Sequence, residues 1–229
     1  MLDIDKTPAI VSTANADVDL LNPTGDMIHL SDITQSLSRK GRYCDQSGVR
    51  FTVAQHTLLC LNIATEVLKI NADESPDVML HILLHDAHEA YTGDISRPLK
   101  RLLDHTGQVT ALEERLDRVI FARFGLDYDE AIGDKPLIKR LDNLALHAEC
   151  EVCFPEVLDR WQGFPEASDK AEMFTHMLVG GAEECRGLGM CPDKYFGAIY
   201  GDLVETYSRR LLRNKAELEL EKLDKAVSL

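Results

Sequence analysis

The sequence lacks the features of membrane, secreted and nucleic-acid-coating proteins. No apolar run approaches the ~20 residues that span a bilayer, and the first residues, MLDIDKTPAIV, do not have the basic segment and apolar stretch of a secretory signal. Basic residues are in the minority, with 25 Lys and Arg against 39 Asp and Glu, which gives a net charge of −14. A surface this acidic repels phosphate backbones, so we expect no binding to a nucleic-acid polymer and no membrane partner.

Cysteine and β-strand signals are also sparse. The six cysteines among 229 residues have no regular spacing, which favours reduced thiols in a cytoplasmic protein over a disulfide framework. Cys150 and Cys153 form a lone CxxC inside an expected helix, and we interpret them as two buried thiols rather than half of a zinc site. Only GVRFTV resembles a strand, so the sequence predicts an all-α fold.

Helical periodicity covers most of the chain. We expect residues 1–229 to form one domain, with residues 1–27 as an irregular N-terminal arm. Start and stop signals such as Ser-Pro before a helix and Gly after one set the expected boundaries. The predicted helices are SDITQSLSR with Ser31 as N-cap, about 52–68, Pro76 through MLHILLHDAHEAY, SRPLKRLL after Pro98, 108–124, 136–154, about 171–185, and a long C-terminal helix over about 193–225.

Four polar side chains interrupt the apolar faces of three of these helices. His56 lies in VAQHTLL, His85 and Asp86 lie in LLHDAHEAY, and Asp142 lies in KRLDNLAL. A buried carboxylate beside a histidine is costly unless it is paired or bound to a metal. Mixed nitrogen and oxygen donors suit Mn²⁺, Fe²⁺, Co²⁺, Ni²⁺ or Zn²⁺ better than Ca²⁺. The set therefore predicts one divalent transition metal, and four separately satisfied core residues are the alternative.

Other polar residues on these helices have structural interpretations. We interpret His81, His88 and His147 as core histidines, because buried histidines on apolar faces are usually satisfied by packing and local partners. The basic cluster RPLKR, residues 97–101, would by itself be a surface patch, but it follows the His-Asp motif and a Gly-Asp turn. A protein of this net charge that binds phosphate must concentrate its cations locally, and this cluster does so.

The order His … His-Asp … Asp resembles that of the HD-domain metal-dependent phosphohydrolases. The finer similarity is to bacterial 5′-deoxynucleotidases and their phage-encoded relatives, which include dATP triphosphohydrolases. SLSRKGRY, FTVAQHTLL, LLHDAHEAYTGDISRPLK and LIKRLDNLALHAE carry it, between about Ile28 and Glu149. The long pattern HDxxExxxGDxxxPxK is far more specific than His-Asp alone. The resemblance implies an all-α HD-domain helical bundle with a metal site between its helices.

The resemblance also implies which residues would bind the metal, orient the attacking water and contact the sugar. It implies that Glu89 orients the attacking water and that Asp94 hydrogen-bonds the sugar. The metal ligands that it implies are His56, His85, Asp86 and Asp142.

Four further residues match positions that contact substrate in that family. Lys100 and Lys139 match the lysines that hold phosphate, and Arg42 and Tyr43 match a loop arginine and the aromatic residue after it. The bacterial enzymes carry tryptophan where this chain has Tyr43, which affects discrimination at the 2′-position of the sugar. Lys139 precedes Asp142 by one helical turn, so both side chains are expected on the same face.

We therefore expect an enzyme that hydrolyses nucleoside 5′-phosphates, first of all 2′-deoxynucleoside monophosphates, to nucleoside and phosphate. One alternative is a deoxynucleoside triphosphohydrolase that releases tripolyphosphate, with Mg²⁺ accompanying its substrate. Another is a catalytically silent HD module that binds a nucleotide or a partner protein, although such a module has no physical need for Glu89. The charged helices at 111–123 and at the C-terminus are compatible with a homo-oligomer.

Overall fold

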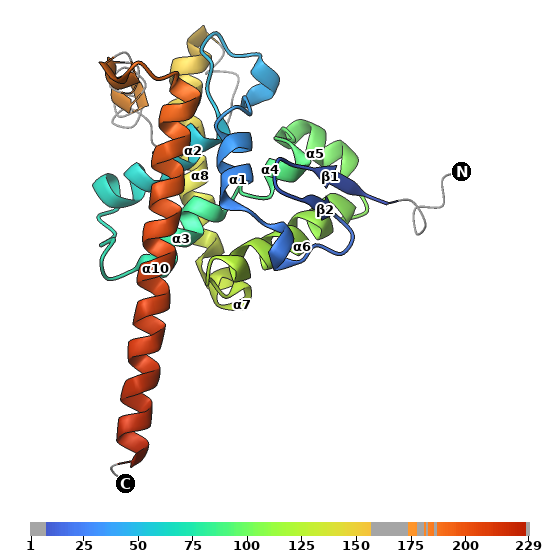
Figure 1. Ribbon diagram of the computed structural model, residues 1–229. Helices are drawn as coiled ribbons and strands as arrows, with labels where there is room; N and C mark the ends of the chain where they lie inside the picture. The colour runs from blue at the N-terminus through green and yellow to red at the C-terminus, as the bar shows by residue number, and fades with distance from the viewer. Residues whose placement is uncertain (1–7, 157–173, 178–180, 182, 186, 228–229) are drawn as a thin grey trace.

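The computed structural model describes residues 8–156, 174–177, 181, 183–185 and 187–227, and these residues are mostly helical (Figure 1). The prediction of an all-α fold is confirmed. No helix among the described residues is long and apolar enough to cross a membrane. The helices are α1 (Leu30–Leu37), α2 (Val53–Asn62), α3 (Pro76–Leu84), α4 (Glu89–Thr92), α5 (Arg97–Leu103), α6 (Gln108–Arg123), α7 (Tyr128–Ala131), α8 (Lys135–Cys153) and α10 (Pro192–Val227).

The core is built around α2 and α3. Nearly every residue of α2 is buried, and α3 is buried over most of its length. The N-terminus of α2 is fixed by a capping box, in which Thr52 and Gln55 exchange side-chain and backbone hydrogen bonds. A helix that is apolar on all sides has to be central, and this places the polar side chain of His56 deep in the protein.

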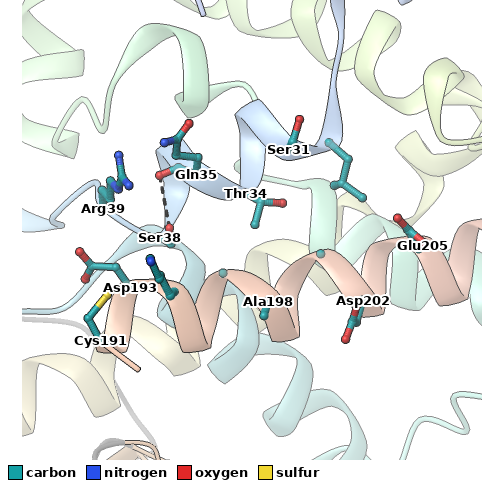
Figure 2. A pocket seen from close by; sticks show the side chains of 14 residues that line it. Ser31, Thr34, Gln35, Ser38, Arg39, Cys191, Asp193, Ala198, Asp202 and Glu205 are labelled. Carbon is teal, nitrogen blue, oxygen red and sulfur yellow. Dashed lines mark hydrogen bonds between the residues drawn. The ribbon is translucent and has the colours of Figure 1, made fainter. Parts of the chain in front are cut away.

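The long helix α10 packs across α1, α2 and α3, and its C-terminal part extends beyond the other elements (Figure 1). Tyr200, fully buried, donates a hydrogen bond of 2.9 Å to the carbonyl of Leu83 at the end of α3. Gly197 lies against α1, where an added Cβ would come within 3.2 Å of Ser38. A groove of about 590 Å³ is lined mostly by residues of α1 and α10 (Figure 2). None of the predicted site residues lines this groove.

The N-terminal arm differs from the expectation that residues 1–27 are irregular. Part of the predicted irregular segment is a hairpin of β1 (Ile10–Ser12) and β2 (Asp17–Asp19), paired antiparallel with Val11 opposite Val18. Val18 is fully buried, and the turn is held by hydrogen bonds from Thr13 and Asn15 to Asp32 of α1. Strands of three residues are too short for an alternating pattern to be visible in a sequence.

Several helix boundaries also differ from the prediction. His29 rather than Ser31 is the N-cap of α1, and α5 begins at Arg97 rather than after Pro98. GVRFTV forms no strand, and only a single bridge joins Gly41 to Thr52. The long helices are predicted well, since α6 ends before Gly125 with its positive φ of 88° and α10 begins at Pro192. The helix expected at about 171–185 lies largely outside the described residues.

The largest correction concerns the helix predicted through MLHILLHDAHEAY. Helix α3 ends at Leu84, residues 85–88 form consecutive turns, and a short α4 runs from Glu89 to Thr92. Nδ1 of His85 is hydrogen-bonded to the carbonyl of Ile82 at 2.7 Å, which fixes the ring at the end of α3. The polar side chains of this segment contact partners from α2 and α6, and these tertiary contacts override the helical propensity.

Candidate metal centre

The four predicted metal ligands meet at one point in the protein. Nε2 of His56 is 3.5 Å from Oδ2 of Asp86 and 3.6 Å from Oδ1 of Asp142. Nε2 of His85 is 3.3 Å from the same Asp86 oxygen. His56 comes from α2, His85 and Asp86 from the turns after α3, and Asp142 from α8, so three parts of the chain that are distant in sequence converge.

The electrostatics of this cluster favour a positive charge. Burial by itself would lower the pKa of His85, but the neighbouring Asp86 and Asp142 outweigh it and raise the pKa to about 9. Burial would raise the pKa of Asp86, yet His85, His56 and Arg42 hold it well below its usual value. The pKa of Asp142 is lowered to about 2, because His56 and nearby cations overcome its burial. The carboxylates therefore attract a cation, either a proton on His85 or a metal ion.

The donor atoms fit a transition metal. Ligands with bonds of about 2.0–2.2 Å to a tetrahedral ion lie roughly 3.3–3.6 Å apart, and the three separations given above fall between 3.3 and 3.6 Å. Nε2 of His85 is buried and makes no hydrogen bond to any residue that the structure describes. Because Nδ1 of this ring is already hydrogen-bonded, Nε2 is the atom left for a metal. These three separations are compatible with one divalent ion shared by two nitrogens and two carboxylates.

Glu149 is a buried carboxylate beside this centre that the sequence interpretation did not assign. Its Oε1 is hydrogen-bonded to Nδ1 of His56, and its Oε2 accepts from Nε of Arg42 at 3.1 Å and from the hydroxyl of Tyr43 at 2.5 Å. Burial raises the pKa of Glu149, but Arg42 and His56 outweigh it, so the net direction is downward. Its position two turns after Asp142 on α8 is the sequence signal that could have identified it.

Glu89 lies next to the centre and keeps one oxygen unpartnered. Within the described part of the chain, Oε2 of Glu89 is buried without a hydrogen bond, and Lys40 donates to the backbone carbonyl of Glu89 at 2.5 Å. Burial and the charges of Asp86 and Asp94 raise the pKa of Glu89 well above its ordinary value. The pKa of Asp94 is also raised, mainly by burial. A carboxylate with a raised pKa and a free oxygen beside a metal cluster is suited to accept a proton.

A cavity of about 1030 Å³ opens beside the cluster, and eight of the ten predicted site residues line it. The exceptions are His56 and His85, which are more deeply buried. The predicted residues that line the cavity are Arg42, Tyr43, Asp86, Glu89, Asp94, Lys100, Lys139 and Asp142.

Cations are concentrated on the wall of this cavity, where they are paired with carboxylates. Arg97 donates to Oδ2 of Asp142 at 2.6 Å and Lys139 to the same oxygen at 2.9 Å. Lys100 forms an ion pair with Glu113 of α6. Arg97 belongs to the basic cluster noted in the sequence, but its contact with Asp142 was not foreseen. The cations are thus placed close to the metal centre.

The loop that carries Arg42 and Tyr43 adopts an unusual backbone. Tyr43, Cys44 and Asp45 all have positive φ angles, of 58°, 53° and 56°. Non-glycine residues rarely occupy this left-handed region. The hydrogen bonds of Arg42 and Tyr43 to Glu149 anchor this loop at the edge of the cavity, as does an edge-on contact between the rings of Tyr43 and Phe154. Such conformations persist where surrounding contacts determine them, often at binding sites.

The predicted structural residues are buried as expected. His81, His88 and His147 are all at most 9% exposed, and Nδ1 of His88 is hydrogen-bonded to Asp117 at 2.9 Å. His88 also lines the cavity, which was not predicted. Cys150 and Cys153 are both free and buried, so their interpretation as thiols is confirmed.

Comparison with known proteins places the chain in a family. No family model matches it. The uncharacterized protein RCAP_rcc00048 of Rhodobacter capsulatus is 32% identical over 140 residues, which cover 58% of this chain and 67% of that protein. This chain belongs to the same family. The uncharacterized protein YfdR of Escherichia coli is 37% identical over 101 residues, which are 44% of this chain and 49% of that relative, about half its length. Since both relatives are uncharacterized, the activity is argued from the site.

Proposed function

We propose that the protein is a cytoplasmic, divalent-metal-dependent phosphohydrolase that acts on nucleoside 5′-phosphates. The observation that carries the proposal is that His56, His85, Asp86 and Asp142 converge beside a cavity lined with cations. Clustered histidines and carboxylates alone could stabilise a core. A cluster with an unpartnered, buried imidazole nitrogen that adjoins a large cation-lined cavity supports chemistry on an anionic substrate.

Each group of residues would have its own role in hydrolysis. A divalent ion held by the four ligands would offset phosphate charge and acidify a water molecule. Glu89 would orient that water and accept its proton at Oε2, the oxygen that has no other partner. Lys100 and Lys139 would pair with the phosphate, exchanging their present contacts with Glu113 and Asp142 for substrate oxygens.

The rest of the nucleotide would occupy the remainder of the cavity. Asp94, which is half-buried and lines the wall, would accept a hydrogen bond from the sugar. Arg42 and Tyr43 would position the base and sugar from the loop that Glu149 anchors. We propose 2′-deoxynucleoside monophosphates as the first substrates to test, cleaved to nucleoside and inorganic phosphate.

One observation favours a deoxynucleoside triphosphate as the second candidate. Arg97 and Arg101 line the cavity in addition to Lys100 and Lys139, and the cavity of about 1030 Å³ is large for a monophosphate. A longer polyphosphate chain needs more cations than one phosphate does. In that case the products would be a deoxynucleoside and tripolyphosphate, and Mg²⁺ would accompany the substrate.

The proposal is tested by product analysis. Metal-depleted protein is supplied with Mn²⁺, Co²⁺, Ni²⁺, Zn²⁺ or Fe²⁺, incubated with each dNMP and, with Mg²⁺ added, each dNTP, and the products are resolved by chromatography. We expect metal-dependent release of phosphate or tripolyphosphate. We expect Asp86→Ala to lose both stoichiometric metal and turnover, whereas Asp202→Ala, an exposed carboxylate on α10, keeps both. Metal binding without turnover on any nucleotide would favour the silent binding module and contradict the proposal.

A further inference from the structure

Cys60 brings a sulfur atom to the metal centre. It lies one helical turn after His56 on α2, the spacing at which two side chains of a helix share a face. Its Sγ is 3.7 Å from Nε2 of His56, the nitrogen that also faces Asp86 and Asp142. One ligand atom from each of His56, Cys60 and His85 lie within 4.8 Å of one another. The thiol is therefore part of the same cluster.

The separations match those of ligands around a common ion. Zinc–sulfur bonds of about 2.3 Å and zinc–nitrogen bonds of about 2.0–2.1 Å place tetrahedral S and N ligands roughly 3.6 Å apart. The observed distance from Sγ to Nε2 of His56 is 3.7 Å. The helical spacing and a thiol–imidazole hydrogen bond bring Sγ to this distance, and the same placement suits a shared ion.

A second observation points to a ligand at this position. Among the residues with described positions, Nε2 of His85 is buried and has no hydrogen bond, while Nδ1 of the same ring is hydrogen-bonded to the carbonyl of Ile82. The side chain of His85 is only 9% exposed. Its charged neighbour is Oδ2 of Asp86, 3.3 Å away, and a cation between the two would satisfy both donors. His85 and Cys60 thus present donors toward the same small volume from two different elements.

We propose that Cys60 is an additional ligand of this centre, and that it makes the site prefer thiophilic ions such as Zn²⁺ and Co²⁺ over Mn²⁺ and Mg²⁺. The inference rests on the metal site of the proposed function. Thiolate donors select Zn²⁺ and related ions, whereas carboxylates alone suit Mn²⁺ and Mg²⁺. On coordination the thiol loses its proton to solvent and the sulfur donates an electron pair to the ion, with no change of oxidation state.

This ligand has a consequence for regulation. Catalytic zinc sites keep a coordination position open, whereas closed sites are structural. Two imidazoles and two carboxylates already fill a tetrahedral shell, and sulfur as a fifth ligand would also fill an expanded, five-coordinate shell, so Zn²⁺ would have no position left for a substrate oxygen. Zn²⁺ would therefore bind tightly and inhibit, whereas a six-coordinate ion that does not engage Cys60 would leave positions free for water and phosphate.

The decisive test is the spectrum of the Co²⁺-loaded protein. Metal-depleted wild-type protein is titrated with Co²⁺ under anaerobic conditions, and the thiolate-to-metal charge-transfer absorption in the near ultraviolet is followed. We expect a band that saturates at one equivalent, is absent in Cys60→Ser and persists in Cys153→Ser, a buried cysteine on α8. Stoichiometric Co²⁺ binding to the wild type without this band would overturn the inference. This outcome is measured on the wild type alone, so it does not depend on the folding of a variant.

Competition between metals provides a second measurement. For Cys60→Ser we expect the affinity for Zn²⁺ to fall by about 10- to 100-fold, the range seen when groups that support a metal site are removed, while the affinity for Mn²⁺ changes much less. Equal losses for both ions would indicate a structural role and contradict the proposal. Circular dichroism and thermal unfolding of Cys60→Ser and Cys153→Ser establish that both variants are folded.

The outcomes separate this inference from the proposed function. Nucleotide turnover with Mn²⁺ but no charge-transfer band would leave the phosphohydrolase standing and remove Cys60 from the centre. A charge-transfer band without turnover on any nucleotide would keep Cys60 as a ligand and contradict the phosphohydrolase. If the wild type binds no divalent metal at all, both are wrong.

Discussion

Nδ1 of His56 is hydrogen-bonded to Oε1 of Glu149, and both side chains are completely buried although 93 residues separate them in the sequence. The carboxylate accepts a hydrogen bond from Nδ1–H, which leaves Nε2 as the nitrogen that faces Asp86 and Asp142. Histidine ligands of metals commonly have such a carboxylate behind them, because it fixes the tautomer and the orientation of the ring. The same carboxylate holds Arg42 and Tyr43, so it links the candidate metal centre to the loop at the cavity edge.

We expect Glu149→Gln to weaken metal binding by about 10- to 100-fold, the usual cost of losing a supporting partner of a ligand. The variant retains the size of the side chain but removes the charge that orients His56 and pairs with Arg42. Isothermal titration calorimetry of metal-depleted protein measures the effect. Glu151→Gln, on the same helix and paired with His147, is the matched control. Wild-type metal affinity in Glu149→Gln would show that this carboxylate only fills the core.

Glu89→Gln should separate chemistry from metal binding. Since Oε2 of Glu89 has no partner and the four ligands lie elsewhere, we expect metal content near that of the wild type. Turnover should fall by about 10²- to 10⁴-fold, the typical contribution of a general acid or base. Elemental analysis and steady-state kinetics measure the two quantities, with Glu114→Gln on the outer face of α6 as control. Loss of the metal in Glu89→Gln would mean that Glu89 is itself a ligand.

Lys100→Ala and Lys139→Ala should weaken catalysis to a similar extent for all four bases, because a phosphate contact carries no information about the base. A hydrogen bond to a charged group contributes about 1.5–3 kcal/mol, which corresponds to roughly 10- to 150-fold in kcat/KM. The comparison requires kcat/KM on four deoxynucleotides for each variant, with the exposed Lys194→Ala of α10 as control. Tyr43→Phe should change base or sugar preference instead. A base-dependent defect in Lys100→Ala would contradict this assignment of the cavity.

The stability of the metal-free protein should decrease as the pH rises from 6.5 to about 9. The pKa of His85 is raised from its ordinary value of 6.5 to about 9 in the folded state by Asp86 and Asp142, which overcome burial. A raised pKa means that protonation stabilises the folded state below pH 6.5, and that this contribution is lost as the pH rises through about 9. With saturating metal the trend should reverse, because the ion displaces the proton.

Urea unfolding of metal-free protein at several pH values measures this dependence. His85→Gln should flatten the decrease, whereas His105→Gln, an exposed histidine, should leave it unchanged. Metal-free stability that rises over the same interval would contradict the raised pKa of His85.

Much of the fold follows from local signals in the sequence. The capping residues Thr52 and Gln55 define the start of α2, Gly125 ends α6, and the periodicity of the C-terminal residues predicts α10 within two residues at each end. These features depend on backbone propensity and on neighbours within one helical turn, which a sequence displays directly. The same holds for the N-terminal boundary of α3 at Pro76.

The sequence also predicted which donors a metal site would use, since each predicted ligand is a polar residue on an otherwise apolar helix. Only the tertiary structure decided that these donors meet, that the chain leaves the helix at residues 85–88 to present them, and that Glu149 and Cys60 join them. Contacts such as that of Arg97 with Asp142 join residues 45 positions apart. Propensity acts over a few residues, whereas the packing of α2, α3 and α8 sets which distant side chains share a buried volume.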